Sequence, residues 1–269
     1  MVEEFLKVWL EAVKGAKEIV MKYFWQNESL DILEKEKENF DSKHFKSPAT
    51  IADREAERYI KEYIGKHFPD HGFLGEEEGS DKKNWDYRWI IDPIDGTKAY
   101  MRGMDDWAIL LALQYKEEMI VGISSMPVVN EVVWASKGMG CFCHGERCQV
   151  SSRVLSEAFL SHERLKYFQR EWLVEELESL YKQVTYYVGA KTPRWFHYLV
   201  QGKVEVIIGP PWMCLYDIAP YVVMVHEAWG KMTTLSWWAV KDDYTSYVAS
   251  NGVVHEEVLR GVEEEGWKH

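Results

Sequence analysis

The sequence predicts a mixed α/β protein, with an α+β N-terminal half at residues 1–150 and an α/β C-terminal half at residues 151–269. Amphipathic helical patterns open the chain, a block of strand-like runs follows, and beyond about residue 150 helix and strand patterns alternate. The 269 residues are enough for one large core or two packed halves. Because no repeat, low-complexity tract or flexible linker interrupts the sequence, we expect the two halves to pack together, with a site between them.

The individual elements follow from hydrophobic periodicity. Residues 3–24 and about 50–66 carry apolar side chains at helical spacing, whereas the charged segment 31–46 has no clear apolar stripe and stays unassigned. The clearest strands are Tyr87–Ile91, Trp107–Tyr115, Met119–Ser124 and Glu131–Ser136. In the C-terminal half the pattern predicts helices near 170–182, 194–201, 217–228 and 253–264, and strands at 185–188, 204–208 and 245–249.

Composition restricts the class of function. The chain has 44 acidic and 32 basic side chains and a net charge of −12, which argues against nucleic-acid binding because phosphate contacts need Lys and Arg. No charge-free stretch approaches the roughly 20 residues of a membrane-spanning helix. Charged residues also interrupt the apolar residues at the N-terminus, unlike in a signal peptide. We therefore expect a soluble cytoplasmic protein with no nucleic-acid or membrane partner.

The four cysteines fit a reducing compartment. Cys141, Cys143 and Cys148 lie close together and Cys214 lies far away, in a chain too long to need a disulfide. We expect reduced, packed thiols. Zinc held by the three clustered cysteines and His144 is the lesser alternative, because C-F-C is shorter than the usual spacing of the first cysteine pair in structural zinc sites.

The segment 89–97, W-I-I-D-P-I-D-G-T, carries the strongest functional signal. A hydrophobic strand ends at Asp92, a proline turns the chain, and Asp95 precedes Gly96 and Thr97 at an expected helix start. Backbone N–H groups at such a start commonly bind phosphate. Two carboxylates do not belong beside a phosphate unless cations bridge them.

Three further acids stand in suggestive contexts. Glu76 lies in G-E-E-E-G, Asp53 in T-I-A-D, and Asp217 at an expected helix start, although each alone is better explained as a surface acid or an N-cap. Like charges about 4 Å apart repel by about 4 kcal/mol at an effective dielectric near 20. Carboxylates converging on one pocket would therefore protonate or bind divalent metal, and all-oxygen ligands favour Mg²⁺.

At these residues the chain resembles the lithium-sensitive phosphatase superfamily. It includes inositol monophosphatases, fructose-1,6-bisphosphatases, phosphoadenosine-phosphate phosphatases and the inositol-phosphatase-like histidinol-phosphate phosphatases. The matching motifs are D-P-I-D-G-T at 92–97, G-E-E at 75–77, T-x-A-D at 50–53 and, in place of W-D-x-A, Y-D-I-A at 216–219. The resemblance spans nearly the whole chain and implies a layered αβαβα sandwich and a homodimer.

The resemblance also implies the role of each residue. The Mg²⁺ ligands would be Glu76, Asp92, Asp95, Asp217 and the carbonyl of Ile94. The groups contacting phosphate or substrate would be Asp95, Gly96, Thr97 and Asp217. The catalytic set would be Asp53, Thr97 and Glu76, which activate a metal-bound water. That water would attack phosphorus directly, so no phosphoenzyme forms.

The substrate is expected to be a small phosphate ester. Arg102-Gly103 followed by Trp107, and Ser47-Pro48 preceded by Lys43, most resemble the histidinol-phosphate branch, and inositol monophosphatase is the runner-up. The stretch 209–214 lacks the acid that both branches tend to carry before the second signature. Outside this class, paired acids could mark a glycoside hydrolase, or the chain could be a non-catalytic binding relative.

Overall fold

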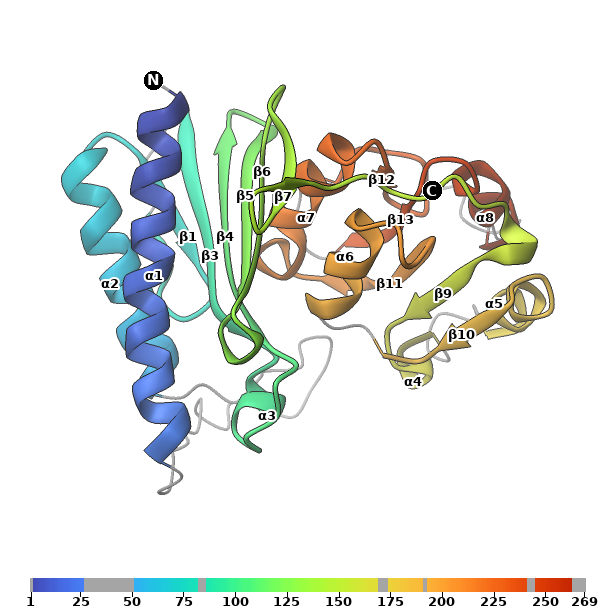
Figure 1. Cartoon of the computed structure of the whole chain (residues 1–269), viewed down its shortest axis with the longest axis horizontal. Helices are drawn as coiled ribbons and strands as arrows, with labels where there is room; N and C mark the ends of the chain where they lie inside the picture. Colours follow the sequence, from blue (N-terminus) through green and yellow to red (C-terminus); the bar gives the residue numbers. More distant parts are fainter. Residues whose placement is uncertain are drawn as a thin grey trace.

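The computed structural model describes residues 2–26, 51–81, 86–168, 174–190, 193–240 and 245–262. Two β-sheets alternate with three layers of helices (Figure 1), which confirms the αβαβα sandwich that the resemblance implied. The charged segment 31–46 and the motif residues Lys43, Ser47, Pro48 and Thr50 lie outside the described residues. Among the helices described, each is too short or too polar to cross a lipid bilayer.

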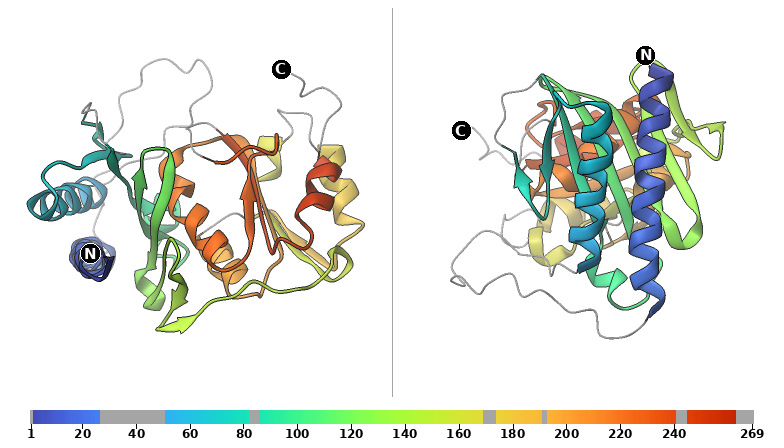
Figure 2. Two further views of the ribbon diagram at one scale, coloured as in Figure 1. Left: turned by 90° about the horizontal axis from the view of Figure 1, so that it is seen from above. Right: turned by 90° about the vertical axis from the view of Figure 1, so that its left-hand side faces the viewer.

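The first sheet has eight strands and is covered on its outer face by α1 (Val2–Gln26) and α2 (Ile51–His67) (Figure 2). Its strand order is β2-β1-β3-β4-β5-β6-β7-β8, and only the β1–β3 pair is parallel. The strands are β1 (Gly72–Gly75), β2 (Gly79–Ser80), β3 (Tyr87–Asp95), β4 (Ala108–Tyr115), β5 (Glu118–Met126), β6 (Glu131–Ser136), β7 (Gly140–Cys143) and β8 (Glu146–Arg147). The short helices α3 (Thr97–Tyr100) and η1 (Pro127–Val129) lie in its connections.

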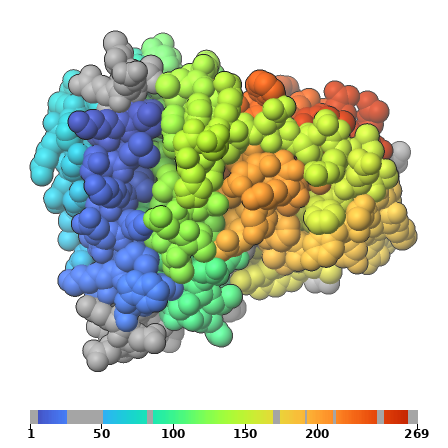
Figure 3. Space-filling model, in the orientation of Figure 1, coloured from blue at the N-terminus to red at the C-terminus, as the bar shows by residue number. Residues whose placement is uncertain are grey.

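The second sheet has five strands in the order β10-β9-β11-β13-β12. These are β9 (Phe159–His162), β10 (Tyr186–Val188), β11 (Val206–Met213), β12 (Lys231–Thr233) and β13 (Thr245–Ser250). Helices α6 (Pro193–Val200) and α7 (Leu215–Glu227) lie between the sheets, and α4 (Leu165–Phe168), α5 (Val174–Tyr181) and α8 (His255–Val262) cover the far face. The segment after β8, which contains η2 (Leu155–Glu157), crosses the visible face from one sheet to the other (Figure 3, yellow-green).

Three hydrophobic clusters hold the five layers together. Successive residues of β3 belong to different clusters, because Ile91 faces α1 and α2 whereas Ile90 faces the central helices. In β11, Ile207 faces the central layer and Ile208 the outer one. Strands covered on both faces are hydrophobic throughout, as these are. The central cluster draws on both predicted halves, and the division at residue 150 stays a prediction.

Helix α7 is apolar on almost every side because it lies between two sheets. It approaches β5 closely at Gly122, where an added Cβ would lie 2.2 Å from the Pro220 carbonyl oxygen. Glycine at this position therefore sets how near the helix can lie to the first sheet.

The predicted helices and strands are confirmed with shifts of a few residues at their ends. Residues 170–173 and 263–264 of two predicted helices lie outside the described residues. The strand predicted at 204–208 is longer, because β11 continues to Met213 through an irregularity after Gly209 that accommodates two prolines. Sequence periodicity missed β1, β9 and β12, since runs of three or four residues are too short to show a period.

Replacing His255 with Gln should make the free energy of unfolding less dependent on pH. His255 is fully buried between Thr233 Oγ1 (3.0 Å) and Ser250 Oγ (2.8 Å), and burial lowers its pKa to about 4. Below about pH 6.5 the unfolded chain binds a proton here and the folded chain does not, so stability falls by up to roughly 3 kcal/mol as the pH falls toward 4.

Urea unfolding at about pH 7 and about pH 5 measures this difference. The exposed His67→Gln variant should keep the wild-type dependence. Equal losses of stability in wild type and His255→Gln would show that His255 does not contribute.

Candidate active site

The D-P-I-D-G-T segment ends β3 with an irregularity that turns its two acids to the same side. Asp92 pairs with Leu110 and Asp95 pairs with Ala108, so two residues on β3 stand opposite one on β4. Without this bulge, residues three apart on a strand would point to opposite faces. Leu110 and Ala108 both face the central layer, so Asp92 and Asp95 lie on the face toward α7.

Helix α7 brings a third acid to the same place. Asp217 lies in its first turn, where its Oδ2 accepts a hydrogen bond from the backbone N–H of Cys214 at 3.2 Å. An acid in this position stabilises a helix start. Carboxylate oxygens of Asp92, Asp95 and Asp217 lie within 4.8 Å of one another. Residues more than a hundred positions apart therefore form one acidic cluster.

Two more acids act on Asp92 electrostatically. Burial raises the pKa of Asp92 well above its usual range, and the charges of Glu76, Asp95, Asp217 and Asp53 raise it further. Glu76 reaches this position because β1 runs parallel to β3, and its backbone N–H donates to the Ile91 carbonyl at 3.1 Å. The structure thus gathers all five predicted acids around the end of β3.

The cluster fits a hard divalent cation. Asp92 Oδ1 accepts a hydrogen bond from the Ile94 N–H at 3.0 Å, whereas Oδ2 is buried and no donor among the described residues reaches it. A buried carboxylate oxygen in this state is costly unless a proton or a cation neutralises it. Several carboxylates sharing one spot provide the oxygen-rich environment that hard divalent cations prefer.

Gly96 and Thr97 follow the cluster at the start of α3. Gly96 has a φ of 97°, and an added Cβ would lie 2.9 Å from the Asp106 carbonyl oxygen, so a side chain is excluded both by the backbone and by space. The Thr97 hydroxyl donates to the Ile94 carbonyl oxygen at 3.1 Å. That oxygen keeps a second lone pair for the predicted cation. The pairing of Thr97 with Asp53 stays a prediction.

Glu57 is a functional candidate that the sequence interpretation missed. It is fully buried on α2, and its carboxylate accepts hydrogen bonds from the backbone N–H groups of Glu77 (2.9 Å) and Glu78 (3.1 Å). Lys61 pairs with it at 2.7 Å. Gly75 leaves room for this carboxylate, since a Cβ there would lie 1.9 Å from Glu57 Oε1. Glu57 therefore holds the turn that carries Glu76. In the sequence, its position one helical turn after Asp53 was the feature that could have identified it.

Tyr216 replaces the tryptophan of the usual second signature and lies near the cluster. Burial raises the pKa of its hydroxyl, and the charges of Glu76 and Asp217 raise it further. Trp107, by contrast, is fully buried and packs edge-on against Tyr100 with ring centroids 4.9 Å apart. Trp107 is thus a residue of the hydrophobic core.

A group of cations lies beside the start of α3, which the sequence interpretation also missed. The pKa of Lys98 is lowered by partial burial and then by the charges of Arg164 and Lys166, with Glu163 acting in the opposite direction. Lys98 directly follows Thr97, whereas Arg164 and Lys166 come from the end of β9 and from α4. The two sheets therefore bring positive charge beside the start of α3.

Comparisons with known proteins identify the family and agree with the fold. The sequence model of the inositol monophosphatase family matches residues 1–266. A histidinol-phosphatase of Mycobacterium tuberculosis is 35% identical over 225 residues, which cover 81% of this chain and 86% of that protein. A fructose-1,6-bisphosphatase/inositol-1-monophosphatase of Thermotoga maritima is 33% identical over 224 residues, which cover 82% of this chain and 84% of that protein. The solved inositol monophosphatase of Thermotoga maritima superposes with a TM-score of 0.79 at 28% identity, over 97% of both chains.

Glu57→Gln should weaken divalent-cation binding because an amide cannot accept both backbone hydrogen bonds and pair with Lys61. We expect Mg²⁺ affinity, measured by calorimetry, to fall by about tenfold or more, in the range seen for groups that orient metal ligands. Glu62→Gln, an exposed change on the same helix, should bind Mg²⁺ like wild type. Unchanged affinity in Glu57→Gln would refute the role of Glu57 in holding the Glu76 turn.

Proposed function

Because this chain belongs to the inositol monophosphatase family and is a phosphoric monoester hydrolase, we propose that it is a Mg²⁺-dependent phosphatase of small phosphorylated metabolites, with histidinol phosphate as the first substrate. The observation that carries the proposal is the convergence of Asp92, Asp95 and Asp217 around a buried carboxylate oxygen. Membership of this family sets aside the glycoside hydrolase alternative. The acidic cluster of Asp92, Asp95 and Asp217 argues against the non-catalytic relative. A cytoplasmic homodimer remains part of the proposal.

The positions of the acids support the proposal of a hard cation. Glu76, Asp92, Asp95, Asp217 and the Ile94 carbonyl would hold Mg²⁺, since they supply oxygen donors from three different segments. When bound, Mg²⁺ polarises the phosphoryl group and lowers the pKa of nearby water.

The remaining groups of the chain would orient the ester and move one proton. Backbone N–H groups at Gly96 and Thr97 would bind phosphate oxygens, as at other helix starts. A water oxygen would form the new bond to phosphorus while the bond to the leaving alkoxide oxygen breaks, and the alkoxide would take a proton from solvent water. Asp53, buried at the start of α2, would receive the water proton by way of Thr97.

Histidinol phosphate is the first candidate because of the relatives. The chain resembles histidinol-phosphatases of three organisms, at 35%, 30% and 31% identity. Within the chain the Arg102-Gly103 motif supports the same branch.

A bisphosphate is a second candidate, favoured by the cations beside α3. Lys98, Arg164 and Lys166 would attract a second anionic group on the substrate. The amine of histidinol phosphate would be repelled there, and the stretch 209–214 offers it no acid. Relatives from Thermotoga maritima and Aquifex aeolicus carry the name fructose-1,6-bisphosphatase/inositol-1-monophosphatase.

Asp95→Asn should abolish turnover with little effect on folding, because it removes the charge of a proposed ligand and keeps its volume. We expect kcat/KM with Mg²⁺ to fall by at least about 100-fold, more than the loss typical of groups that only orient ligands. Phosphate release and thermal unfolding are measured on the same samples. The exposed Asp70→Asn variant should match wild type in both. A wild-type rate in Asp95→Asn would refute the ligand assignment.

A comparison of kcat/KM across histidinol phosphate, inositol phosphate, fructose 1,6-bisphosphate and phosphoadenosine phosphate distinguishes the two candidates. Arg164→Gln should lower kcat/KM for the bisphosphate by about two- to fivefold, the effect of one exposed charge pair, and leave inositol phosphate unchanged. The exposed Arg260→Gln variant is the control. Equal losses for every substrate would exclude Arg164 as a selectivity determinant.

A further inference from the structure

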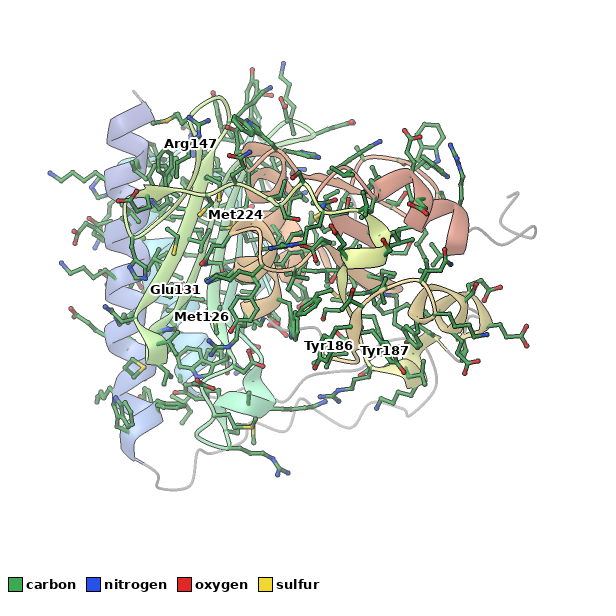
Figure 4. All side chains as sticks on the ribbon, turned by 45° about the vertical axis from the view of Figure 1, so that its right-hand side comes forward. Met126, Glu131, Arg147, Tyr186, Tyr187 and Met224 are labelled. Carbon is green, nitrogen blue, oxygen red and sulfur yellow. The ribbon has the colours of Figure 1, made fainter. Side chains whose placement is uncertain are left out.

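A second group of metal-binding side chains lies away from the acidic cluster. One donor atom from each of Glu131, Cys143 and His144 lies within 4.8 Å of the others. Glu131 begins β6 (Figure 4), Cys143 ends β7, and His144 lies in the turn to β8. Strands β4 and β5 separate β6 from β3 in the sheet, so this group is independent of the acids around Asp92.

The strand pairing explains why these side chains meet. Cys143 pairs with Val133 on β6, and Glu131 lies two residues before Val133, so Glu131 and Cys143 face the same side of the sheet. His144 and Gly145 both have positive φ, 51° and 82°, as in the tightest hairpin turns. Asn or Gly fits the first turn position at the least cost, and histidine is among the other residues that adopt positive φ.

A chain of hydrogen bonds orients the Glu131 carboxylate. Its Oε1 accepts from His197 Nδ1 at 2.6 Å, and His197 Nε2 lies 2.8 Å from Ser124 Oγ, which in turn lies 3.2 Å from the Tyr221 hydroxyl. Serine, histidine and acid in this order resemble a hydrolase triad. However, Ser124 and His197 are both 0% exposed, so no substrate reaches them. The chain therefore fixes the position of Glu131.

The Cys143 thiol has an orienting partner of its own. Gln201 Nε2 donates to Cys143 Sγ at 3.8 Å, and Lys203 Nζ donates to Gln201 Oε1 at 2.7 Å, which sets the direction of the amide. Partners that hold metal ligands from outside are typical of built metal sites. Two of the three side chains in this group have such partners.

We propose that Glu131, Cys143 and His144 form a second metal site, which binds Zn²⁺ through three protein ligands and keeps a fourth position open. Sulfur, nitrogen and oxygen donors together suit Zn²⁺ and not Mg²⁺. Tetrahedral Zn²⁺ places its ligand atoms about 3.5 Å apart, so donors that lie within 4.8 Å of one another need only a small closing movement. The exposed hairpin turn that carries His144 allows that movement.

This ligand set differs from the zinc alternative drawn from the sequence. Cys141 and Cys148 face each other across the β7–β8 hairpin, where the Cys148 N–H donates to the Cys141 carbonyl at 2.8 Å. Their thiols hydrogen-bond each other and lie in the central hydrophobic cluster. All four cysteines are unbridged. These two are therefore packed thiols, as the sequence predicted, and Cys143 is the cysteine whose sulfur lies within 4.8 Å of donor atoms of Glu131 and His144.

Co²⁺ titration of the full chain in saturating Mg²⁺ tests the proposal. Mg²⁺ fills the acidic cluster, and a thiolate-to-cobalt charge-transfer band reports only on a sulfur ligand. We expect the band to saturate at one Co²⁺ per chain and to disappear when Zn²⁺ is added. Cys143→Ser should abolish the band, and His144→Asn and Glu131→Gln should each weaken Co²⁺ affinity by about tenfold or more.

Matched variants control for thiol count and folding. Cys141→Ser removes a buried thiol from the same strand, His67→Asn removes an exposed histidine, and both should keep the band. His144→Asn is exposed and Asn tolerates positive φ, so this variant decides the question if Cys143→Ser fails to fold. Absence of a band in wild type, or its survival at full strength in His144→Asn, would overturn the proposal. Loss of the band in Cys141→Ser would also overturn it.

Discussion

Repulsion among the carboxylates at the end of β3 is the constraint on which the rest of this structure depends. Two such charges about 4 Å apart cost about 4 kcal/mol at an effective dielectric near 20. Four other carboxylates raise the pKa of Asp92 beyond the effect of burial. No local segment would adopt this arrangement alone. Four of the acids are therefore held by backbone elements with their own support: a bulge in β3, the Glu57-bound turn after β1, and the first turn of α7.

The layered fold supplies that support. Helix α7 is buried between two sheets, and the close approach at Gly122 fixes its distance from the first sheet. Because Asp217 lies in the first turn of this packed helix, the packing also fixes its position beside the acids of β3. Rigid elements hold reacting groups more accurately than loops do, which suits a site that must concentrate charge.

The same central layer also contacts β6, which lies beyond β4 and β5 in the first sheet. Tyr221 lies one helical turn after Asp217 on α7, and through Ser124 and His197 it reaches Glu131 at the start of β6. The polar chain is continuous among side chains that are otherwise hydrophobic. Buried networks of this kind, with each member paired, favour one arrangement of the elements that they join.

The sequence by itself determined the helices, the longer strands, and the two signatures that contain Asp92, Asp95 and Asp217, because these depend on local periodicity and on short motifs. It also predicted that distant acids meet. Only the tertiary structure decided which other groups join them. Glu57 and the cations Lys98, Arg164 and Lys166 occur in unremarkable local contexts, and Trp107 proved to be core. The physical reason is that spacing along the chain governs helix and strand faces, whereas contacts between layers depend on how those faces pack.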